Sequence, residues 1–319
     1  AKAREAQEVW KNYTFKQRAK HIQKIKRFLA DHAEEAADIV SKCNGKTRVD
    51  ALATEVIPST LACDWYSKNA EQVLKPQRIP NGSILFINKS TFLQYQPVGV
   101  VGIISPWNYP LTIPFGEVIM GLMAGNAIVL KVATQTVLVG SFIEKCIAAG
   151  DLPEGLFSHI VAGGAATSKA FFANRVDKIF FTGSVGVGKQ LMKQASDTLT
   201  PVSLELGGKD AMIVCADADL ERATNCAAWA GYQNAGQSCG GVERVYVQQA
   251  IFQDFVDLLA AKTNALRHGY DDGVNSVDIG CMTTESQLNI VKRQVDGAVK
   301  AGAKIVAQSR PVGDVSNGY

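Results

Sequence analysis

One cysteine lies in the glycine-rich segment NAGQSCGG, residues 234–241, and not in an apolar run. Cys239 is flanked by Ser238, Gly240 and Gly241, whose small side chains leave room for an electrophile to reach the sulfur. A thiolate is a strong nucleophile, and a helix terminus or a bound cation favours its ionisation. The segment therefore predicts a reactive thiol.

Two other segments carry groups that would complement such a thiol. In LELGGKD, Glu205 lies between apolar residues near a strand end, where burial would raise its pKa towards that of a general base. In ISPWNYP, two prolines stiffen a turn around Asn108, whose amide is a neutral donor suited to a developing oxyanion. A purely structural role remains open for both residues. The Glu205 carboxylate could instead bind neighbouring N–H groups or Lys209, and the Asn108 amide could bind the backbone of its own turn.

The segment FFTGSVGVGKQ, residues 180–190, follows an apolar run and opens a helical pattern. Its glycines permit close backbone approach, and a helix N-terminus attracts phosphate. Three interpretations remain: a dinucleotide site, a triphosphate loop and a plain strand-to-helix turn. Gln190 stands where a triphosphate loop needs Ser or Thr, and the glycine spacing departs from GxGxxG. Lys131, which closes AIVLK, is a candidate ligand for a ribose hydroxyl or a phosphate.

Hydrophobic periodicity predicts the elements that position these groups. Residues 1–77 are typical of amphipathic helices, and residues 82–97 of an extended hairpin that forms an arm or edge ribbon. From Val98 onward, short β-branched runs alternate with helical stretches, which predicts βαβ units and a mainly parallel sheet. Helices are expected at 138–149, 189–195, 252–266 and 285–301, and strands at VGVVGIIS, AIVLK, LFSHIV, KIFF, VSLEL, AMIVC and RVYV.

Composition narrows the class of protein. A net charge of +3 with interspersed signs argues against a nucleic-acid surface. The seven cysteines are widely spaced, and there is no CxxC pair, so neither a zinc site nor a disulfide framework is expected. A reducing, cytoplasmic setting is expected instead. Residues 111–129 are the nearest thing to a membrane span, but Pro114 and Glu117 favour a helix followed by a strand.

Taken together, PWNYP, GNAIVLK, FTGSVGVG, LELGGK and GQSC with Arg244 five residues on resemble the aldehyde dehydrogenase superfamily. The motifs occur in the family's order and at about its separations, and the match runs through the whole chain. Each motif alone is weak, whereas the set is specific.

The resemblance implies a role for each matching residue. Cys239 resembles the nucleophile, Glu205 the base that activates the hydrolytic water, and Asn108 a donor to the oxyanion. The implied cofactor-binding residues are Lys131, Thr134, Gly183, Ser184, Trp107, Ile104, Gly163 and Leu206. The implied neighbours of the substrate are Tyr109, Gly116 and Ser238.

Two departures from the family pattern concern specificity. Thr134 stands where many members have a glutamate that repels a 2′-phosphate, so NAD and NADP are both expected to bind, with NADP tolerated or preferred. Gly116 stands where many members have a bulky aromatic residue, so a roomier entrance suited to larger or aromatic aldehydes is expected. No metal is expected.

The resemblance also implies an organisation. A Rossmann-like dinucleotide-binding domain is expected at 1–79 and 98–207, an oligomerisation arm at 80–97, and part of an α/β catalytic domain at 208–319. The arm implies a homodimer or homotetramer. The family's later motif for the nicotinamide ribose and its last oligomerisation strand do not occur before Tyr319, so a longer chain is expected.

The implied function is oxidation of an aldehyde to a carboxylic acid with NAD(P), through a cysteine-bound thioester that water hydrolyses. Alternatives are a CoA-acylating enzyme, which Glu205 argues against, a P-loop-like nucleotide-binding protein, and a non-catalytic protein on the same scaffold.

Overall fold

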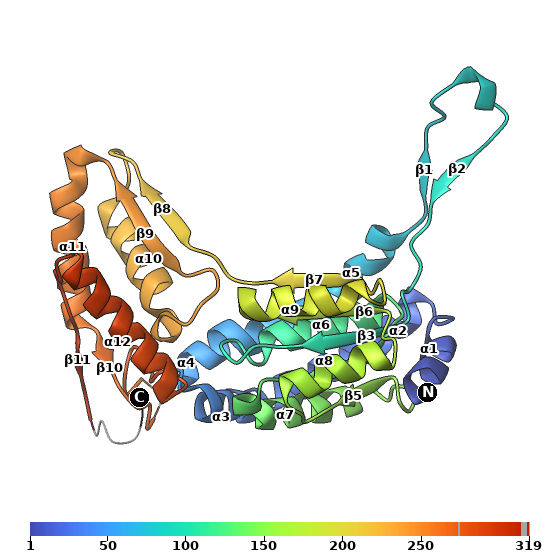
Figure 1. Ribbon diagram of the computed structural model, residues 1–319, viewed down its shortest axis with the longest axis horizontal. Helices are drawn as coiled ribbons and strands as arrows, with labels where there is room; N and C mark the ends of the chain where they lie inside the picture. The colour runs from blue at the N-terminus through green and yellow to red at the C-terminus, as the bar shows by residue number, and fades with distance from the viewer. Residues whose placement is uncertain (274, 314–317, 319) are drawn as a thin grey trace.

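A five-stranded parallel sheet forms the centre of the larger of two lobes (Figure 1). The computed structural model describes residues 1–273, 275–313 and 318. The strands lie in the order β5-β4-β3-β6-β7, and every residue of β3 is buried. Their bounds are β3 (Val100–Ile104), β4 (Ala127–Lys131), β5 (Phe157–His159), β6 (Lys178–Thr182) and β7 (Val202–Glu205). The predicted α/β fold with a parallel sheet is confirmed.

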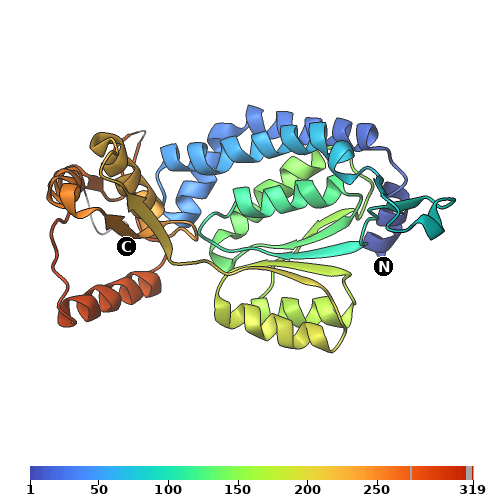
Figure 2. The ribbon, with the colours of Figure 1, turned by 90° about the horizontal axis from the view of Figure 1, so that it is seen from above.

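Helices cover both faces of this sheet, which explains why its strands are continuous apolar runs. Figure 2 shows the N-terminal helices and α6 on one face and α8 and α9 on the other. The crossover helices are α6 (Thr112–Met123), α7 (Val137–Ala148), α8 (Gly164–Ala173) and α9 (Val185–Ser196). The helices before the sheet are α1 (Lys2–Trp10), α2 (Phe15–Asp31), α3 (Ala33–Asn44), α4 (Arg48–Ala51) and α5 (Ile57–Leu74), with a π-helical turn η1 (Leu52–Val56) between α4 and α5.

Helix α2 illustrates how the sequence forms these elements. Ile22, Ile25 and Leu29 recur on one face, and all three are fully buried. Thr14 and Gln17 form a capping box that satisfies N–H groups at the first turn. The helix therefore begins at a polar signal and is held by its apolar face.

The predicted hairpin exists, but its first strand lies outside the predicted range. Strand β1 (Gln77–Ile79) pairs antiparallel with β2 (Thr91–Leu93), and the tip between them holds a short 3-10 turn, η2 (Ile84–Phe86). The prediction of an extended ribbon over 82–97 was therefore wrong in its first strand, because residues 82–90 form the loop. The arm projects from the end of the larger lobe opposite the smaller one (Figure 1).

The smaller lobe has its own apolar core. Val214, Ala227 and Phe255 form a buried cluster separate from that of the larger lobe. Strand β8 (Asp210–Val214) pairs parallel with β9 (Val242–Val247), flanked by α10 (Leu220–Tyr232) and α11 (Phe252–Ala265). The sequence analysis missed α10, although Asp219 is a good N-cap that accepts a hydrogen bond from the backbone of Arg222. The remaining elements are α12 (Glu285–Lys300), the short strands β10 (Arg267–His268) and β11 (Arg310–Pro311), and the 3-10 turns η3 (Thr134–Thr136), η4 (Gln233–Gly236) and η5 (Gln249–Ile251).

Candidate active site

The carboxyl ends of the large sheet meet along one edge. Ile104 ends β3 and is the register partner of both Lys131, which ends β4, and Phe181 in β6. Glu205, at the end of β7, pairs with Thr182. Strand order reverses on the two sides of β3, so this edge holds a topological switch point, where α/β sheets bind their ligands.

The glycine-rich turn lies at this switch point. Gly183 follows β6, and Ser184 is the N-cap of α9, its hydroxyl accepting from the backbone N–H of Val187 at 3.4 Å. A Cβ atom on Gly186 would meet no atom within 4 Å, so the first turn of α9 is open to a ligand. Because helix N-termini present free N–H groups, this turn suits a phosphate.

Helix α8 begins after β5, at the same edge of the sheet, and close packing against the segment after β7 fixes α9. Gly163 is exposed and is the N-cap of α8, with no side-chain cap. A Cβ atom at Gly188 would lie 2.7 Å from a methyl group of Leu206, so the glycine lets α9 approach the segment after β7. Leu206 is half-buried and thereby helps to orient the first turn of α9.

Lys131 and Thr134 lie at the end of β4. Lys131 is only 7% exposed, and burial lowers the pKa of its ammonium group. Within the described part of the chain, this group has no ion-pair partner, which fits a residue that binds a ligand. Thr134 opens η3 and is exposed, so its side chain is available to a group held by Lys131.

The turn after β3 is fixed by hydrogen bonds from a distant helix. The side-chain amide of Asn44, which is fully buried at the end of α3, donates to the carbonyl oxygen of Trp107 at 3.0 Å. Asn108 Oδ1 accepts from the backbone N–H of Tyr109 at 3.0 Å. The structural alternative therefore holds for the oxygen of the Asn108 amide, which bonds the backbone of its own turn.

The other end of the Asn108 amide reaches the cysteine loop. Its Nδ2 donates to the carbonyl oxygen of Gln237 at 3.1 Å, and the side chain of Asn234 donates to the carbonyl oxygen of Asn108 at 3.0 Å. These bonds join the end of β3 to a loop that follows it by more than 120 residues. Because an amide nitrogen carries two protons, the bond to Gln237 leaves one of them for an oxyanion.

Cys239 is exposed on this loop. The loop is tightly turned: Asn234 and Ala235 both have left-handed backbone conformations, with φ of 53° and 55°. The Ser238 side chain, directly before the thiol, lies close enough to the Tyr109 hydroxyl to act to lower its pKa. The sulfur is thus accessible, while the loop that carries it is held on both sides.

Glu205 differs from expectation in one respect. It is exposed, so the expected burial of this carboxylate was wrong: β7 is an edge strand, and Glu205 is its last residue. The buried carboxyl of this region is Glu117 on α6, whose pKa is raised to about 8 by burial and then by the charge of Glu205. Glu117 Oε2 is buried and has no hydrogen-bond partner among the described residues.

The three residues expected near a substrate lie in different elements: Tyr109 follows β3, Gly116 lies on α6 and Ser238 precedes the thiol. Tyr109 is buried, and its hydroxyl accepts from the side-chain amide of Gln233 at 2.6 Å. Ser238 is half-buried. Gly116 lies on α6, and a Cβ atom placed there would meet nothing within 4 Å, so the space beside the helix is open.

Sequence reasoning missed a buried ion pair beneath this site. Lys46 Nζ lies 2.6 Å from Glu55 Oε1, and neither side chain is exposed to solvent. The only signal was two charged residues at positions 46 and 55 in a helical region, and nothing in their spacing linked them to Asn108.

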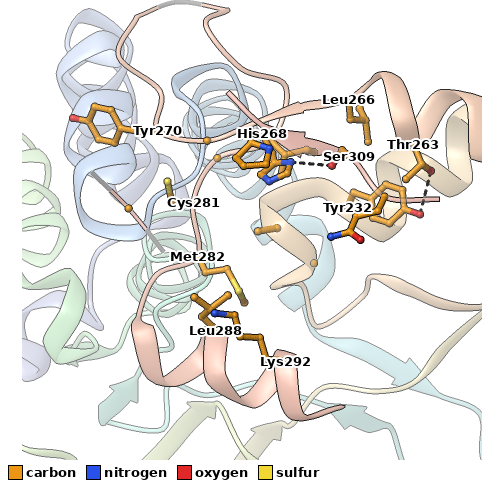
Figure 3. Close-up of a pocket in the computed structure, with 18 of the residues that line it drawn as sticks. Tyr232, Thr263, Leu266, His268, Tyr270, Cys281, Met282, Leu288, Lys292 and Ser309 are labelled. Atoms are coloured by element: carbon orange, nitrogen blue, oxygen red, sulfur yellow. Dashed lines mark hydrogen bonds between the residues drawn. The ribbon is translucent and has the colours of Figure 1, made fainter. Parts of the chain in front are cut away.

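A large hollow lies elsewhere. A cavity of about 780 Å³ lies in the smaller lobe, lined by residues including His268, Cys281 and Lys292 (Figure 3). Within it, His268 Nδ1 lies 2.8 Å from Ser309 Oγ. None of the predicted site residues lines this cavity. Among the described residues, no group of His, Cys, Asp and Glu could hold a metal ion, and no helix is long and apolar enough to span a membrane.

A doubly wound parallel sheet with an open helix N-terminus at its switch point defines an α/β nucleotide-binding scaffold, here facing an exposed thiol. The chain belongs to the aldehyde dehydrogenase family, whose model matches residues 1–319.

Individual relatives agree with this assignment. The chain is 35% identical over 303 residues to a 4,4'-diapolycopene aldehyde oxidase of Methylomonas sp, covering 95% of this chain and 56% of that protein. It is 34% identical over 317 residues to a putative succinate-semialdehyde dehydrogenase [NADP(+)] 2 of Mycobacterium ulcerans, covering 99% and 60%. The chain therefore spans less than two thirds of the length of these relatives.

Solved structures share the fold. A putative aldehyde dehydrogenase from Burkholderia cenocepacia superposes with a TM-score of 0.92 at 30% identity, covering 98% of this chain and 65% of that one. An aldehyde dehydrogenase from Bacillus cereus, solved as an NAD+ complex, superposes with a TM-score of 0.89 at 31% identity, covering 96% and 62%.

Proposed function

We propose that the protein oxidises an aldehyde to a carboxylic acid, with NAD or NADP as the hydride acceptor. The observation that carries this proposal is the 3.1 Å bond between Asn108 Nδ2 and the carbonyl oxygen of Gln237. It holds a neutral donor beside the loop of an exposed cysteine, at the edge of a sheet that suits a dinucleotide. Family membership supports the same reaction class.

In this mechanism the Cys239 thiolate adds to the aldehyde carbon, and the carbonyl π electrons move onto oxygen. The free proton of Asn108 Nδ2 and the backbone N–H of Cys239 stabilise that oxyanion. When bound, the nicotinamide ring supplies the acceptor for the hydride that leaves the former aldehyde carbon. Loss of the hydride leaves a thioester on Cys239, which is reactive enough to hydrolyse.

Glu205 acts in the second half of the reaction. Its carboxylate takes a proton from a water molecule while the oxygen attacks the thioester carbon. The tetrahedral species collapses by expelling the Cys239 thiolate, and the carboxylic acid is released. The exposure of Glu205 at the end of β7 supports this role, because water can reach it.

The cofactor-binding residues fit a dinucleotide. The open first turn of α9, capped by Ser184, would hold a phosphate, and Gly163 lies at the N-terminus of α8. Lys131 would hold the adenosine ribose, which would supply its buried ammonium group with polar partners. Ile104 and Trp107 would contribute backbone to the cleft.

Cofactor choice follows from Thr134. With no carboxylate at this position, nothing in the Lys131–Thr134 segment repels a 2′-phosphate, so we propose that NADP binds as well as NAD. Similar proteins include some whose names or titles specify NADP and one whose title specifies NAD+.

Substrate choice follows from Gly116. The open space at this glycine supports an entrance that admits larger or aromatic aldehydes. The names of two relatives specify two different aldehydes. The proposed substrate preference is therefore based on Gly116 and not on those names.

Assembly follows from the arm. Ile84, Leu85 and Ile87 at its tip are each about four-fifths exposed. Exposed apolar clusters of this kind mark protein–protein contacts, so we propose a homodimer or homotetramer joined through the arm.

The reaction is tested with the full-length protein, aldehydes of several sizes and both cofactors. We expect NAD(P)H to form with the wild type and with Cys226→Ser, a control at another exposed cysteine, and not with Cys239→Ser. Equal activity of Cys239→Ser and the wild type would refute the proposal. Formation of an acyl-CoA only when CoA is added would instead indicate the acylating alternative.

A further inference from the structure

The buried ion pair of Lys46 and Glu55 lies directly under the turn that carries Asn108. Both residues are 0% exposed, and their charged atoms are 2.6 Å apart. Burial lowers the pKa of Lys46 and raises that of Glu55, and their mutual attraction opposes both shifts. A buried pair of this kind is often no more stable than a well-packed apolar pair, so its presence calls for another explanation.

Glu55 holds the start of α6. Its second oxygen, Oε2, accepts from the backbone N–H groups of Leu111 and Thr112, each at 2.8 Å. A carboxylate at a helix N-terminus is favoured by the free N–H groups and by the helix dipole. Because Asn108 lies three residues before Leu111, fixing this helix start also fixes where the turn ends.

The local backbone aims Glu55 at this target. Residues Leu52–Val56 form a π-helical turn, a rare conformation that is frequent at functional sites. The carbonyl oxygen of Glu55 accepts from Ser59 Oγ at 2.6 Å, which holds the turn from the other side.

Lys46 contacts the same turn through an aromatic ring. Its Nζ lies 4.1 Å from the centroid of the Tyr109 ring, within the range of a cation–π interaction. The hydroxyl of that ring accepts from Gln233, which precedes the cysteine loop, and the Ser238 side chain acts to lower its pKa. The buried cation is therefore linked through one side chain to the start of the cysteine loop and to the residue before Cys239.

We propose that Lys46 and Glu55 are positioning residues that hold the Asn108 amide and the Cys239 loop in the relative placement that thiohemiacetal formation requires. Glu55 fixes the turn through Leu111 and Thr112, and Lys46 fixes Tyr109 and through it Ser238. Neither residue touches the reacting atoms. This inference depends on the proposed function and names residues that its mechanism does not use.

The test is the double variant Lys46→Met/Glu55→Gln, which removes both charges at nearly constant volume. Because it leaves no unpaired buried charge, the midpoint of unfolding should change little. We expect kcat to fall by about 10- to 100-fold, since small misplacements of reacting groups cost this much. The KM for NAD(P) should stay within about twofold, because the phosphate-binding turn lies on other elements.

A matched control is Lys26→Met/Asp64→Asn. This pair has its charged atoms 2.7 Å apart but joins α2 to α5 away from the turn, so kcat should be unchanged. Tyr109→Phe keeps the ring beside Lys46 and removes the hydroxyl, and it should reproduce part of the loss. An active wild type together with a stable double variant of wild-type kcat would overturn the inference and leave the proposed function standing.

A second measurement does not depend on activity. Hydrogen exchange should accelerate in the double variant at residues 107–112 and also at 234–241, and in neither segment of the control. Acceleration confined to 107–112 would show a local structural role only and would overturn the inference. If the wild type oxidised no aldehyde, the proposed function would fail, and the exchange of 234–241 would still decide whether the ion pair holds the loop.

Discussion

Asn108 Nδ2 lies 3.1 Å from the carbonyl oxygen of Gln237, two positions before Cys239, although 129 positions separate the two residues in the chain. The side-chain amide of Asn108 thus joins the turn after β3 to the loop that carries Cys239.

Replacing Asn108 with alanine should remove an oxyanion donor while leaving the thiol in place. We expect kcat to fall by about 100- to 1000-fold, the usual cost of losing one such donor. Alkylation of Cys239 by iodoacetamide, followed by peptide mass spectrometry, should continue. Asn12→Ala, which removes an exposed amide just after α1, should have wild-type kcat. A wild-type kcat in Asn108→Ala would contradict the assignment.

Replacing Glu205 with glutamine should slow hydrolysis of the thioester more than its formation. We expect a burst of about one NAD(P)H per site followed by a turnover rate about 100-fold or more below that of the wild type. Intact mass should show the acyl adduct on the protein. Glu243→Gln, an exposed carboxylate paired with Lys209, is the control. No burst and no adduct would place Glu205 outside the hydrolytic step.

Introducing glutamate at position 134 should restore discrimination against a 2′-phosphate. In Thr134→Glu we expect kcat/KM for NADP to fall at least about tenfold, equivalent to about 1.4 kcal/mol, with little change for NAD. Thr134→Gln adds similar bulk without charge and separates repulsion from steric hindrance. A wild type that strongly prefers NAD would refute the expectation directly.

Filling the space at Gly116 should narrow the substrate entrance. In Gly116→Phe we expect kcat/KM for an aromatic aldehyde to fall about tenfold or more, while that for acetaldehyde changes little. Gly116→Ala adds a Cβ atom into open space, so it should keep the wild-type preference and stabilise α6 by roughly 0.5–1 kcal/mol. A wild type active only on two- or three-carbon aldehydes would count against the proposed entrance.

The buried carboxyl of Glu117 should make stability depend on pH. Its pKa is raised to about 8 in the folded protein, whereas an unfolded glutamate titrates near about 4.3. Between the unfolded pKa and the folded pKa, the unfolded chain releases a proton that the folded protein retains. The free energy of unfolding therefore falls as pH rises through this range, and it levels off above about 8.

Glu117→Gln should remove this dependence. The variant should match the wild type at about pH 4 and become relatively more stable as pH rises, by at most about 1.4 kcal/mol for each pH unit. Urea unfolding from pH 4 to 9 measures this difference, with the exposed Glu154→Gln as the control. Parallel curves for wild type and variant would show that Glu117 is ionised in the folded protein.

Local patterns were sufficient to identify most elements of the larger lobe, although α8 was not among the expected helices. Alternating β-branched runs and amphipathic stretches determined a parallel α/β sheet, and the short motifs determined which residue types could act as nucleophile, base and donor. The arm was less well predicted, because its three-residue strands have exposed side chains and no buried face to impose a pattern.

Burial of polar groups could not be obtained from the sequence. Glu205 and Glu117 both lie among apolar neighbours in the chain, yet the first is exposed at the end of an edge strand and the second is half-buried on a crossover helix with one carboxyl oxygen shielded from solvent. A residue's solvent exposure depends on which elements pack over it, and local composition does not carry that information.

The sequence by itself determined the family, the α/β class and the choice of Cys239, Glu205 and Asn108 as candidate catalytic residues. These conclusions depend only on residue types and short spacings. Only the tertiary structure decided that Asn108 meets the loop of Cys239 and that Lys46 and Glu55 lie beneath their junction. Those contacts join residues brought together by the packing of helices and strands, and no local rule of sequence specifies such a meeting.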